Sequence, residues 1–400
     1  MKNNSLISFR LPLSFTNHSW QAALLCAAVC LSFSARDVRA AAFGYGNLVV
    51  VLDGTPGGAT LSSAATAASL WEYTTSGAFV QSINLPTAAS GANQALTLSG
   101  TATSEGFLTL SGNGQYLTMA GYAAAPGTAG VVTATPATVN RVVARIDMNG
   151  NVDTTTSLTD ANSGSNIRSA ASIDGTSIWT SGNAGSGLGA TAGIRSTSFG
   201  STTSVRVDST ASNMRVVNIF NGQLYTSSAT GTLLGISTVG LGLPTTLSSS
   251  TITLLPGMPT TGTHSPYDFL FSDANTLYVA DDGTAANGGG IQKWIFSGGT
   301  WTLAYTLLNN GTTTTGVRGL TGYLDASGSF ELFGTTSATS GNTLIEVTDT
   351  GAGSIANILA TAGANTVFRG VELIPTVPEP TSLALLGLGL LGLRGLRRQR

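Results

Sequence analysis

The chain has 400 residues, of which only 9% are charged, while glycine alone occupies 51 positions. Between residues 41 and 376 it carries nine basic and 17 acidic residues, a net charge of about −8. With Lys293 as its single lysine, this part lacks the clustered basic residues that phosphates require, so we expect no nucleic-acid partner. Both cysteines, Cys26 and Cys30, lie outside it, and His264 is its one histidine. We therefore expect no disulfide, no His/Cys metal site and no cofactor.

The first 40 residues have the pattern of a secretory signal peptide. Lys2 and Arg10 are basic, and residues 22–33 form an apolar core. Ala40 ends a small-residue cleavage site before Ala41. We expect cleavage between these two alanines, which leaves residues 41–376 as the exported domain.

Short alternating apolar runs recur through this domain. Examples are residues 48–52, 116–119, 291–296 and 344–347. They are bounded by turn dipeptides such as Asn113-Gly114, Asn149-Gly150, Asp174-Gly175 and Asn221-Gly222. No stretch shows a convincing 3.6-residue stripe, so the pattern predicts an all-β domain rather than helices or a disordered coat.

A longer repeat of about 50 residues underlies the short runs. Five segments open with a charge and reach a turn residue seven positions later: 105–112, 168–175, 215–222, 268–275 and 318–325. The opening charges are separated by 63, 47, 53 and 50 residues, and further strands follow each opening segment. Four antiparallel strands in about 50 residues are typical of one β-propeller blade.

The two ends of the domain predict closure of a ring. Residues 368–373 repeat the opening strand but lack three followers, whereas residues 46–52, 69–74 and 78–85 supply three strands without an opener. Pairing these fragments completes a sixth blade and removes open sheet edges. We predict a single propeller of six four-stranded blades. The alternatives are seven blades, if residues 87–139 contain another, and a parallel β-helix or adhesin-like Ser/Thr/Gly array.

In a propeller the opening strands line the centre, so their first charges become neighbours. The predicted ring consists of Glu105, Arg168, Arg215, Asp268, Arg318 and Arg369. As a ligand site, an arginine majority suits carboxylate or sulfate groups, such as those of an acidic exopolysaccharide. The alternative is structural, with the arginines bonded to nearby carbonyls and to the two acidic residues.

Signals for catalysis are few. His264 precedes an opening strand, but Ser265 and Asp268 are too local to form a triad, and no Gly-x-Ser-x-Gly elbow exists. We expect a loop histidine and no catalytic residues. Asp281-Asp282-Gly283 is typical of a turn more than of a calcium loop, because neighbouring strand residues point to opposite faces. No metal site is expected.

The four tryptophans of the domain fall within or beside predicted strands. They are Trp71, Trp179, Trp294 and Trp301. At such positions core packing between blades is favoured over stacking against a sugar.

The C-terminal tail combines three features in a fixed order. The motif Val377-Pro378-Glu379-Pro380 ends the domain and precedes an apolar run over residues 383–393. A cluster of four arginines closes the chain: Arg394, Arg397, Arg398 and Arg400. A membrane span needs about 20 residues, so we expect a short apolar helix that inserts marginally, with its arginines on the cytoplasmic side.

This tail, residues 377–400, resembles a PEP-CTERM sorting signal. The resemblance covers about 24 of the 400 residues. It implies recognition and removal by an exosortase, a membrane transpeptidase of Gram-negative bacteria that also make exopolysaccharide. The tail would then occupy the inner membrane only transiently. The alternative is a weak anchor helix of no particular family.

These expectations favour a noncatalytic cell-surface or matrix protein that binds exopolysaccharide in a biofilm. The alternative is an exported propeller enzyme acting on a sugar or lactone, with His264 and carboxylates near the centre of the ring. A Ser/Thr-rich coat whose role is bulk and glycosylation is a third possibility.

Overall fold

The computed structural model describes residues 41–247, 252–308 and 315–376. In these ranges the chain is built from antiparallel strands and two short 3-10 helices, η1 (Gly189–Thr191) and η2 (Ala285–Asn287). Neither helix has the length and apolar character needed to cross a bilayer, and this part of the chain offers no other candidate. The expected signal peptide, sorting motif and C-terminal helix lie outside the described residues.

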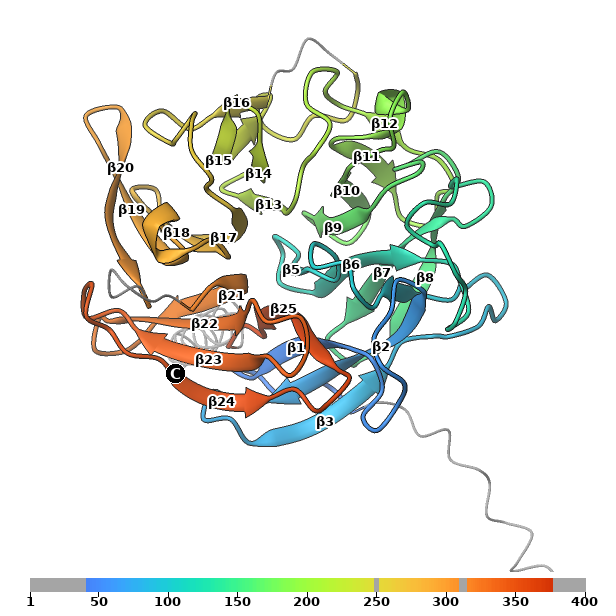
Figure 1. The fold of residues 1–400 in the computed structure, drawn as a ribbon, viewed down its shortest axis with the longest axis horizontal. Helices are drawn as coiled ribbons and strands as arrows, with labels where there is room; N and C mark the ends of the chain where they lie inside the picture. Colours follow the sequence, from blue (N-terminus) through green and yellow to red (C-terminus); the bar gives the residue numbers. More distant parts are fainter. Residues whose placement is uncertain (1–40, 248–251, 309–314, 377–400) are drawn as a thin grey trace, which may run out of the picture. The chain divides into compact units, whose positions relative to one another are not determined.

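Four separate sheets each contain four antiparallel strands in chain order (Figure 1). The first is β9 (Ile167–Ser172), β10 (Ser177–Gly182), β11 (Arg195–Ser198) and β12 (Val205–Arg206). The second is β13 (Val217–Phe220), β14 (Gln223–Thr230), β15 (Leu233–Val239) and β16 (Ile252–Leu254). The third is β17 (Pro266–Asp273), β18 (Thr276–Asp281), β19 (Gly290–Ser297) and β20 (Thr300–Leu307). The fourth is β21 (Val317–Leu324), β22 (Phe330–Thr336), β23 (Thr343–Thr348) and β24 (Asn357–Thr361).

The remaining nine strands form one sheet. They are β1 (Leu48–Asp53), β2 (Ala65–Tyr73), β3 (Phe79–Asn84), β4 (Thr97–Ser99), β5 (Leu108–Leu110), β6 (Tyr116–Tyr122), β7 (Arg141–Asp147), β8 (Val152–Leu158) and β25 (Val367–Leu373). The short strand β4 joins the two halves, because it pairs with β2 on one side and with β6 on the other. The all-β propeller fold is therefore confirmed. Four blades form separate sheets, and the remaining strands share one sheet, so the sheet order does not confirm the predicted count of six.

The two ends of the described domain meet in this sheet. Strand β1 pairs antiparallel with β25, with Leu48 opposite Leu373 and Val50 opposite Val371. On its other edge β1 pairs with β2. The predicted pairing of N- and C-terminal strands is confirmed. Strands β1 and β25 are therefore each held in the sheet by a partner from the opposite end of the domain.

Strand β1 shows how a continuous apolar run forms a strand that is buried on both faces. All six residues of β1 are buried. Leu48, Val50 and Leu52 enter one hydrophobic cluster, whereas Val49 and Val51 enter another. Because successive strand residues point to opposite faces, a continuous apolar run fills the cores on both sides of a blade.

The predicted turn dipeptides also fold as expected. Asn221 and Gly222 connect β13 to β14, and Phe220 pairs directly with Gln223. Both turn residues have positive φ, at 48° and 72°. A two-residue hairpin of this type requires φ above zero at both positions, which Asn and Gly tolerate best.

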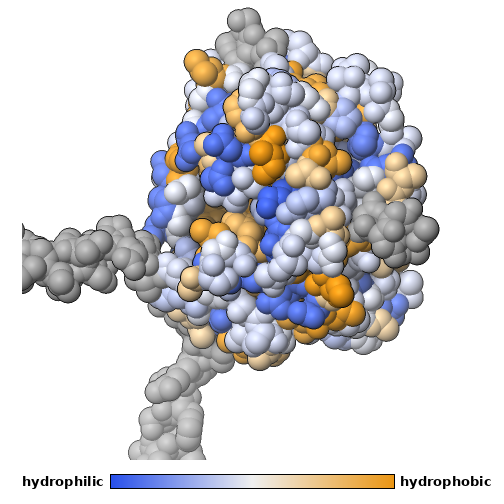
Figure 2. Space-filling view, turned by 90° about the vertical axis from the view of Figure 1, so that its left-hand side faces the viewer, coloured by the Kyte–Doolittle hydropathy of each residue, from blue (hydrophilic) through white to orange (hydrophobic). Residues whose placement is uncertain are grey.

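The strands that lie nearest the centre in Figure 1 are called the inner strands here: β5, β9, β13, β17, β21 and β25. Strand β25 packs against β5 and β21, and β9 packs against β5 and β13. Residues 87–139, where a seventh blade was an alternative, contain only β4, β5 and β6 among the named strands. On the side nearest β20, Figure 2 shows small hydrophobic patches separated by hydrophilic residues.

Candidate functional site

Three arginines gather around one tyrosine at the starts of neighbouring inner strands. Arg168 belongs to β9, Arg215 precedes β13, and Arg318 belongs to β21. The ring centroid of Tyr267, in β17, lies 3.9 Å from Cζ of Arg215 and 5.6 Å from Cζ of Arg318. We call these four residues the arginine cluster. Guanidinium groups over the face of an aromatic ring are held by cation–π attraction.

Two of the arginines are bonded only to neutral acceptors. Nη1 of Arg168 donates to Oδ1 of Asn213 at 2.6 Å and to the Met214 carbonyl at 3.1 Å. Nη1 of Arg215 donates to Oγ of Ser265 at 3.0 Å and to the carbonyl of the next residue at 2.8 Å. Each arginine thus reaches the segment that leads into the next inner strand, and no carboxylate among the described residues pairs with either.

Arg318 differs because it has an acidic partner. Its Nε donates to Oδ2 of Asp282 at 2.8 Å, and its Nη1 donates to the Ser337 carbonyl at 2.5 Å. The arginine cluster therefore holds three guanidinium groups against one directly bonded carboxylate.

Burial and a neighbouring positive charge both act on Arg168. Burial, followed by the nearby charge of Arg215, lowers the pKa of Arg168 to about 10. This value still leaves Arg168 protonated at neutral pH. An anion placed beside the two guanidinium groups would offset their repulsion, and forked N–H donors match the two oxygens of a carboxylate or sulfate.

Arg369 and Glu105, the other two charged residues at the starts of inner strands β25 and β5, are bonded to other protein groups. Arg369 is buried and forms an ion pair with Asp53. Glu105 accepts hydrogen bonds from Ser99 N at 2.9 Å, from the Tyr122 hydroxyl at 2.5 Å and from the Asn166 amide. Burial raises the pKa of Glu105 to about 7 in spite of these bonds. Both residues fit the structural alternative.

Asp268 departs from the predicted ring. Its carboxylate accepts hydrogen bonds from the backbone amides of Phe269, at 2.9 Å, and Leu320, at 3.1 Å. Burial, with the charge of Glu372, raises its pKa well above the ordinary value. The preceding residue, Tyr267, faces the arginines instead. Adjacent strand residues point to opposite sides, so alignment by charge selected the wrong one of the two.

His264 lies in the loop before β17, as expected. It interacts with Asp281, whose pKa is raised, mainly by burial, although the nearby His264 opposes this shift. The Asp281 carboxylate already accepts from the backbone amides of Ser265, at 2.9 Å, and Gly283, at 2.7 Å. Asp282 points the other way, toward Arg318.

The described residues contain no group of three or more His, Cys, Asp or Glu side chains arranged to hold a metal ion. The sequence did not identify Tyr267, Asn213 or Ser265 as members of the site. A usable signal was present, because Tyr267 is an aromatic residue directly beside an aligned charge. Asn213 and Ser265 carry no such signal, since their role depends on arginines about 45 to 50 positions away.

The fold is that of a β-propeller, and three arginines gather around Tyr267 where its inner strands begin. Residues 376–399 match the PEP-CTERM protein-sorting motif. This motif implies recognition by an exosortase and export through the cell envelope to the surface.

Comparisons of the whole fold give distant likenesses to solved structures. A protein from Lactobacillus plantarum is 13% identical with a TM-score of 0.42, covering 79% of this chain and 82% of that one. Hydrazine synthase from Kuenenia stuttgartiensis is 11% identical with a TM-score of 0.41, covering 72% and 75%. YCF48 from Cyanidioschyzon merolae is 13% identical with a TM-score of 0.37, covering 66% and 76%. A search of curated proteins found no match. Likeness at this level transfers no activity to this chain.

Proposed function

We propose that this protein is a noncatalytic cell-surface or matrix component of a Gram-negative bacterium. In this role the arginine cluster binds carboxylate or sulfate groups of an acidic exopolysaccharide, as in a biofilm. A signal peptide over residues 1–40 starts export, and an exosortase removes the sorting tail at the inner membrane.

One observation carries the binding proposal. Arg168 and Arg215 lie close enough for one charge to lower the pKa of the other, and both are bonded only to neutral acceptors. Buried or half-buried charges are normally paired, because an uncompensated charge in a low-dielectric site is costly. A polyanion supplies the missing partner, and its many repeats compensate for weak contacts at any one unit.

The absence of catalysis is also part of the proposal. The carboxylate beside His264 is occupied by backbone amides, and the second one is paired with Arg318. This arrangement favours a structural use of both acidic residues over a general acid–base pair.

Titration calorimetry with an oligogalacturonate tests the proposal. We expect binding that weakens as salt rises, because part of the attraction is electrostatic. The Arg215→Gln variant should bind about 10- to 100-fold less tightly, since charge-assisted hydrogen bonds contribute about 1.5–3 kcal/mol. The control is Arg145→Gln, which removes an arginine stacked on Phe199, outside the cluster. Equal affinity of the two variants would contradict the proposal.

We further propose that the propeller has six blades. The nine-stranded sheet then consists of β25-β1-β2-β3 and β5-β6-β7-β8, with β4 as a bridge. The weakness of the bridge supports this division: β4 pairs with three residues of β2 and, through Thr97 alone, with β6. The ladders within each half are longer, as between β6 and β7.

A further inference from the structure

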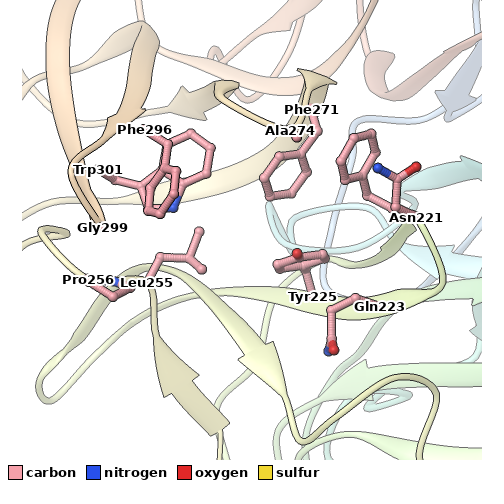
Figure 3. Close-up of a pocket in the computed structure, with 11 residues that line it drawn as sticks. Asn221, Gln223, Tyr225, Leu255, Pro256, Phe271, Ala274, Phe296, Gly299 and Trp301 are labelled. Carbon is pink, nitrogen blue, oxygen red and sulfur yellow. The ribbon is translucent and has the colours of Figure 1, made fainter.

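A pocket of about 390 Å³ opens between the β13–β16 blade and the β17–β20 blade. It lies at the far ends of the inner strands from the arginine cluster, because Phe220 ends β13 and Phe271 lies near the end of β17. Five aromatic side chains line it: Phe220, Tyr225, Phe271, Phe296 and Trp301. In Figure 3, Phe296 and Trp301 face Phe271 and Tyr225 across the opening. Its volume is within the range of small-molecule sites.

The aromatic rings brace one another. Phe220 and Phe271 are stacked with centroids 4.7 Å apart and an interplanar angle of 14°. Tyr225 also contacts Phe271 at 4.7 Å, and Phe296 contacts Trp301 at 5.3 Å. Phe271 and Trp301 are buried, whereas the other three are partly exposed. The pocket thus presents flat apolar faces that need little ordering when a ligand binds.

Three of the polar groups around these rings have no partner among the described residues, whereas the Gln223 amide is bonded to Leu224, Gly240 and Gly242. The Tyr225 hydroxyl, the Trp301 Nε1–H and the Asn221 side-chain amide make no hydrogen bond to any described residue. The indole N–H groups of the other tryptophans in the domain are all bonded: Trp71 to Ser69, Trp179 to Pro244 and Trp294 to Gln292. Since a tryptophan in a core normally has a partner for its N–H, the unbonded indole of Trp301 is directed to something other than the protein.

The lining carries no charged side chain. Apart from the aromatic residues it consists of Asn221, Gln223, Leu255, Pro256, Ala274 and Gly299. A carboxylate or phosphate would lose its hydration here without gaining a cation. The ligand class that fits is neutral, with flat apolar faces and several hydroxyl groups at its edge.

We propose that this pocket binds a neutral pyranose ring of a glycan, stacked on the aromatic faces with its hydroxyls bonded to Tyr225, Trp301 and Asn221. The C–H face of a pyranose packs against an aromatic ring, while its equatorial hydroxyls extend sideways toward polar groups. The site is separate from the arginine cluster and does not depend on it. Trp301 is buried, as the sequence predicts. Because it also lines the pocket, its indole N–H is one of the proposed sugar contacts.

The test uses the purified protein and neutral tetrasaccharides of glucose, galactose or mannose, with ligand-observed NMR to detect binding and calorimetry to measure affinity. Tyr225→Phe keeps the ring and removes the hydroxyl, so it should weaken binding roughly two- to tenfold. Phe220→Ala removes a stacking face and should weaken it at least as much. The control Phe79→Ala deletes an exposed aromatic ring of β3 and should leave affinity unchanged.

Arg215→Gln should also leave affinity for these neutral sugars unchanged, which separates this site from the acidic-glycan proposal. If Phe220→Ala does not fold, Tyr225→Phe alone decides the result. The proposal is overturned if no tetrasaccharide binds the wild-type protein, or if Tyr225→Phe binds as tightly as the wild type. Saturable binding of indole without binding of any sugar would overturn it as well.

Discussion

Arg369 on β25 donates to Asp53 on β1 across 316 positions of the sequence, with Nη2 2.7 Å and Nε 3.1 Å from the same carboxylate oxygen. The two side chains are only 3% and 0% exposed. The ion pair lies inside the sheet in which the two ends of the domain meet. It therefore connects the first and last strands by charge as well as by their backbone ladder.

The first prediction concerns this ion pair. Asp53→Asn should lower the free energy of unfolding by about 3–5 kcal/mol, because it leaves a buried guanidinium without its counter-charge. Urea denaturation followed by far-UV circular dichroism measures the change. Glu346→Gln removes a carboxylate that makes no hydrogen bond to any described residue and should change stability by less than about 0.5 kcal/mol. A loss below 1 kcal/mol for Asp53→Asn would show that the pair contributes little.

The second prediction is a pH dependence of stability that originates at Glu105. Burial raises the pKa of this carboxyl from 4.5 to about 7 in the folded protein. Between these values the folded state keeps a proton that the unfolded chain has lost. The free energy of unfolding should therefore fall as pH rises through this window, by at most about 1.4 kcal/mol per pH unit from this group. Its contribution is complete below about pH 4.5 and lost above about pH 7.

Denaturation at pH 4.5, 6 and 7.5 gives the slope, and Glu105→Gln should make it shallower whatever its effect on absolute stability. Carbon-13 NMR of the glutamate carboxyls gives a direct check. Burial also raises the pKa of Glu372 to about 7, and the pKa values of Asp53 and Asp268 are raised as well. These groups change stability in the same direction, so the slope should decrease without vanishing. A Glu105 carboxyl that titrates near 4.5 would refute this account.

The third prediction tests how closely two inner strands approach. A Cβ atom added at Gly370 on β25 would lie 2.3 Å from the Leu108 amide nitrogen and 2.8 Å from the Gly106 carbonyl oxygen. Backbone atoms cannot move aside as a flexible side chain can, so Gly370→Ala should destabilise the protein by at least about 1–3 kcal/mol. Gly353→Ala is the matched control, because nothing lies within 4 Å of the added atom. Similar unfolding midpoints for the two variants would mean that β25 and β5 are packed less closely.

The fourth prediction concerns the sorting tail. Deleting residues 377–400 should move the protein from the cell-surface fraction to the culture medium, because the exosortase no longer has a motif to recognise. Immunoblots of the fractions measure the distribution, and intact mass of the surface form should show a chain without the tail. Arg145→Gln, with its tail intact and its change outside the arginine cluster, should distribute like the wild type. An unchanged surface fraction after the deletion would rule out a role of the motif in sorting.

Local pattern predicted much of the fold. Alternating runs located strands to within a few residues, as at β19 and β23, and turn dipeptides located hairpins such as that between β13 and β14. The missing strands at the two ends predicted the pairing of β1 with β25. The bridge made by β4 was not predicted, because three residues are too short a run to show a period.

The candidate site was predicted less completely. Aligning the opening charges identified Arg168, Arg215 and Arg318, but it included Asp268 in place of Tyr267. The aromatic pocket was missed because its lining comes from strand ends and turns of two blades, and each aromatic residue by itself is typical of a core.

The sequence by itself therefore determined the class of fold, the pairing of the two ends of the domain and the sorting motif at its C-terminus, since all three are encoded in short-range patterns. Only the tertiary structure decided which charges are paired and which aromatic rings share a pocket. The partners of Arg168 and Arg215 lie in the segments that lead into the next blade, and the pocket around Trp301 is lined by residues of two blades. One residue of register decides whether a side chain faces such a neighbour or points away.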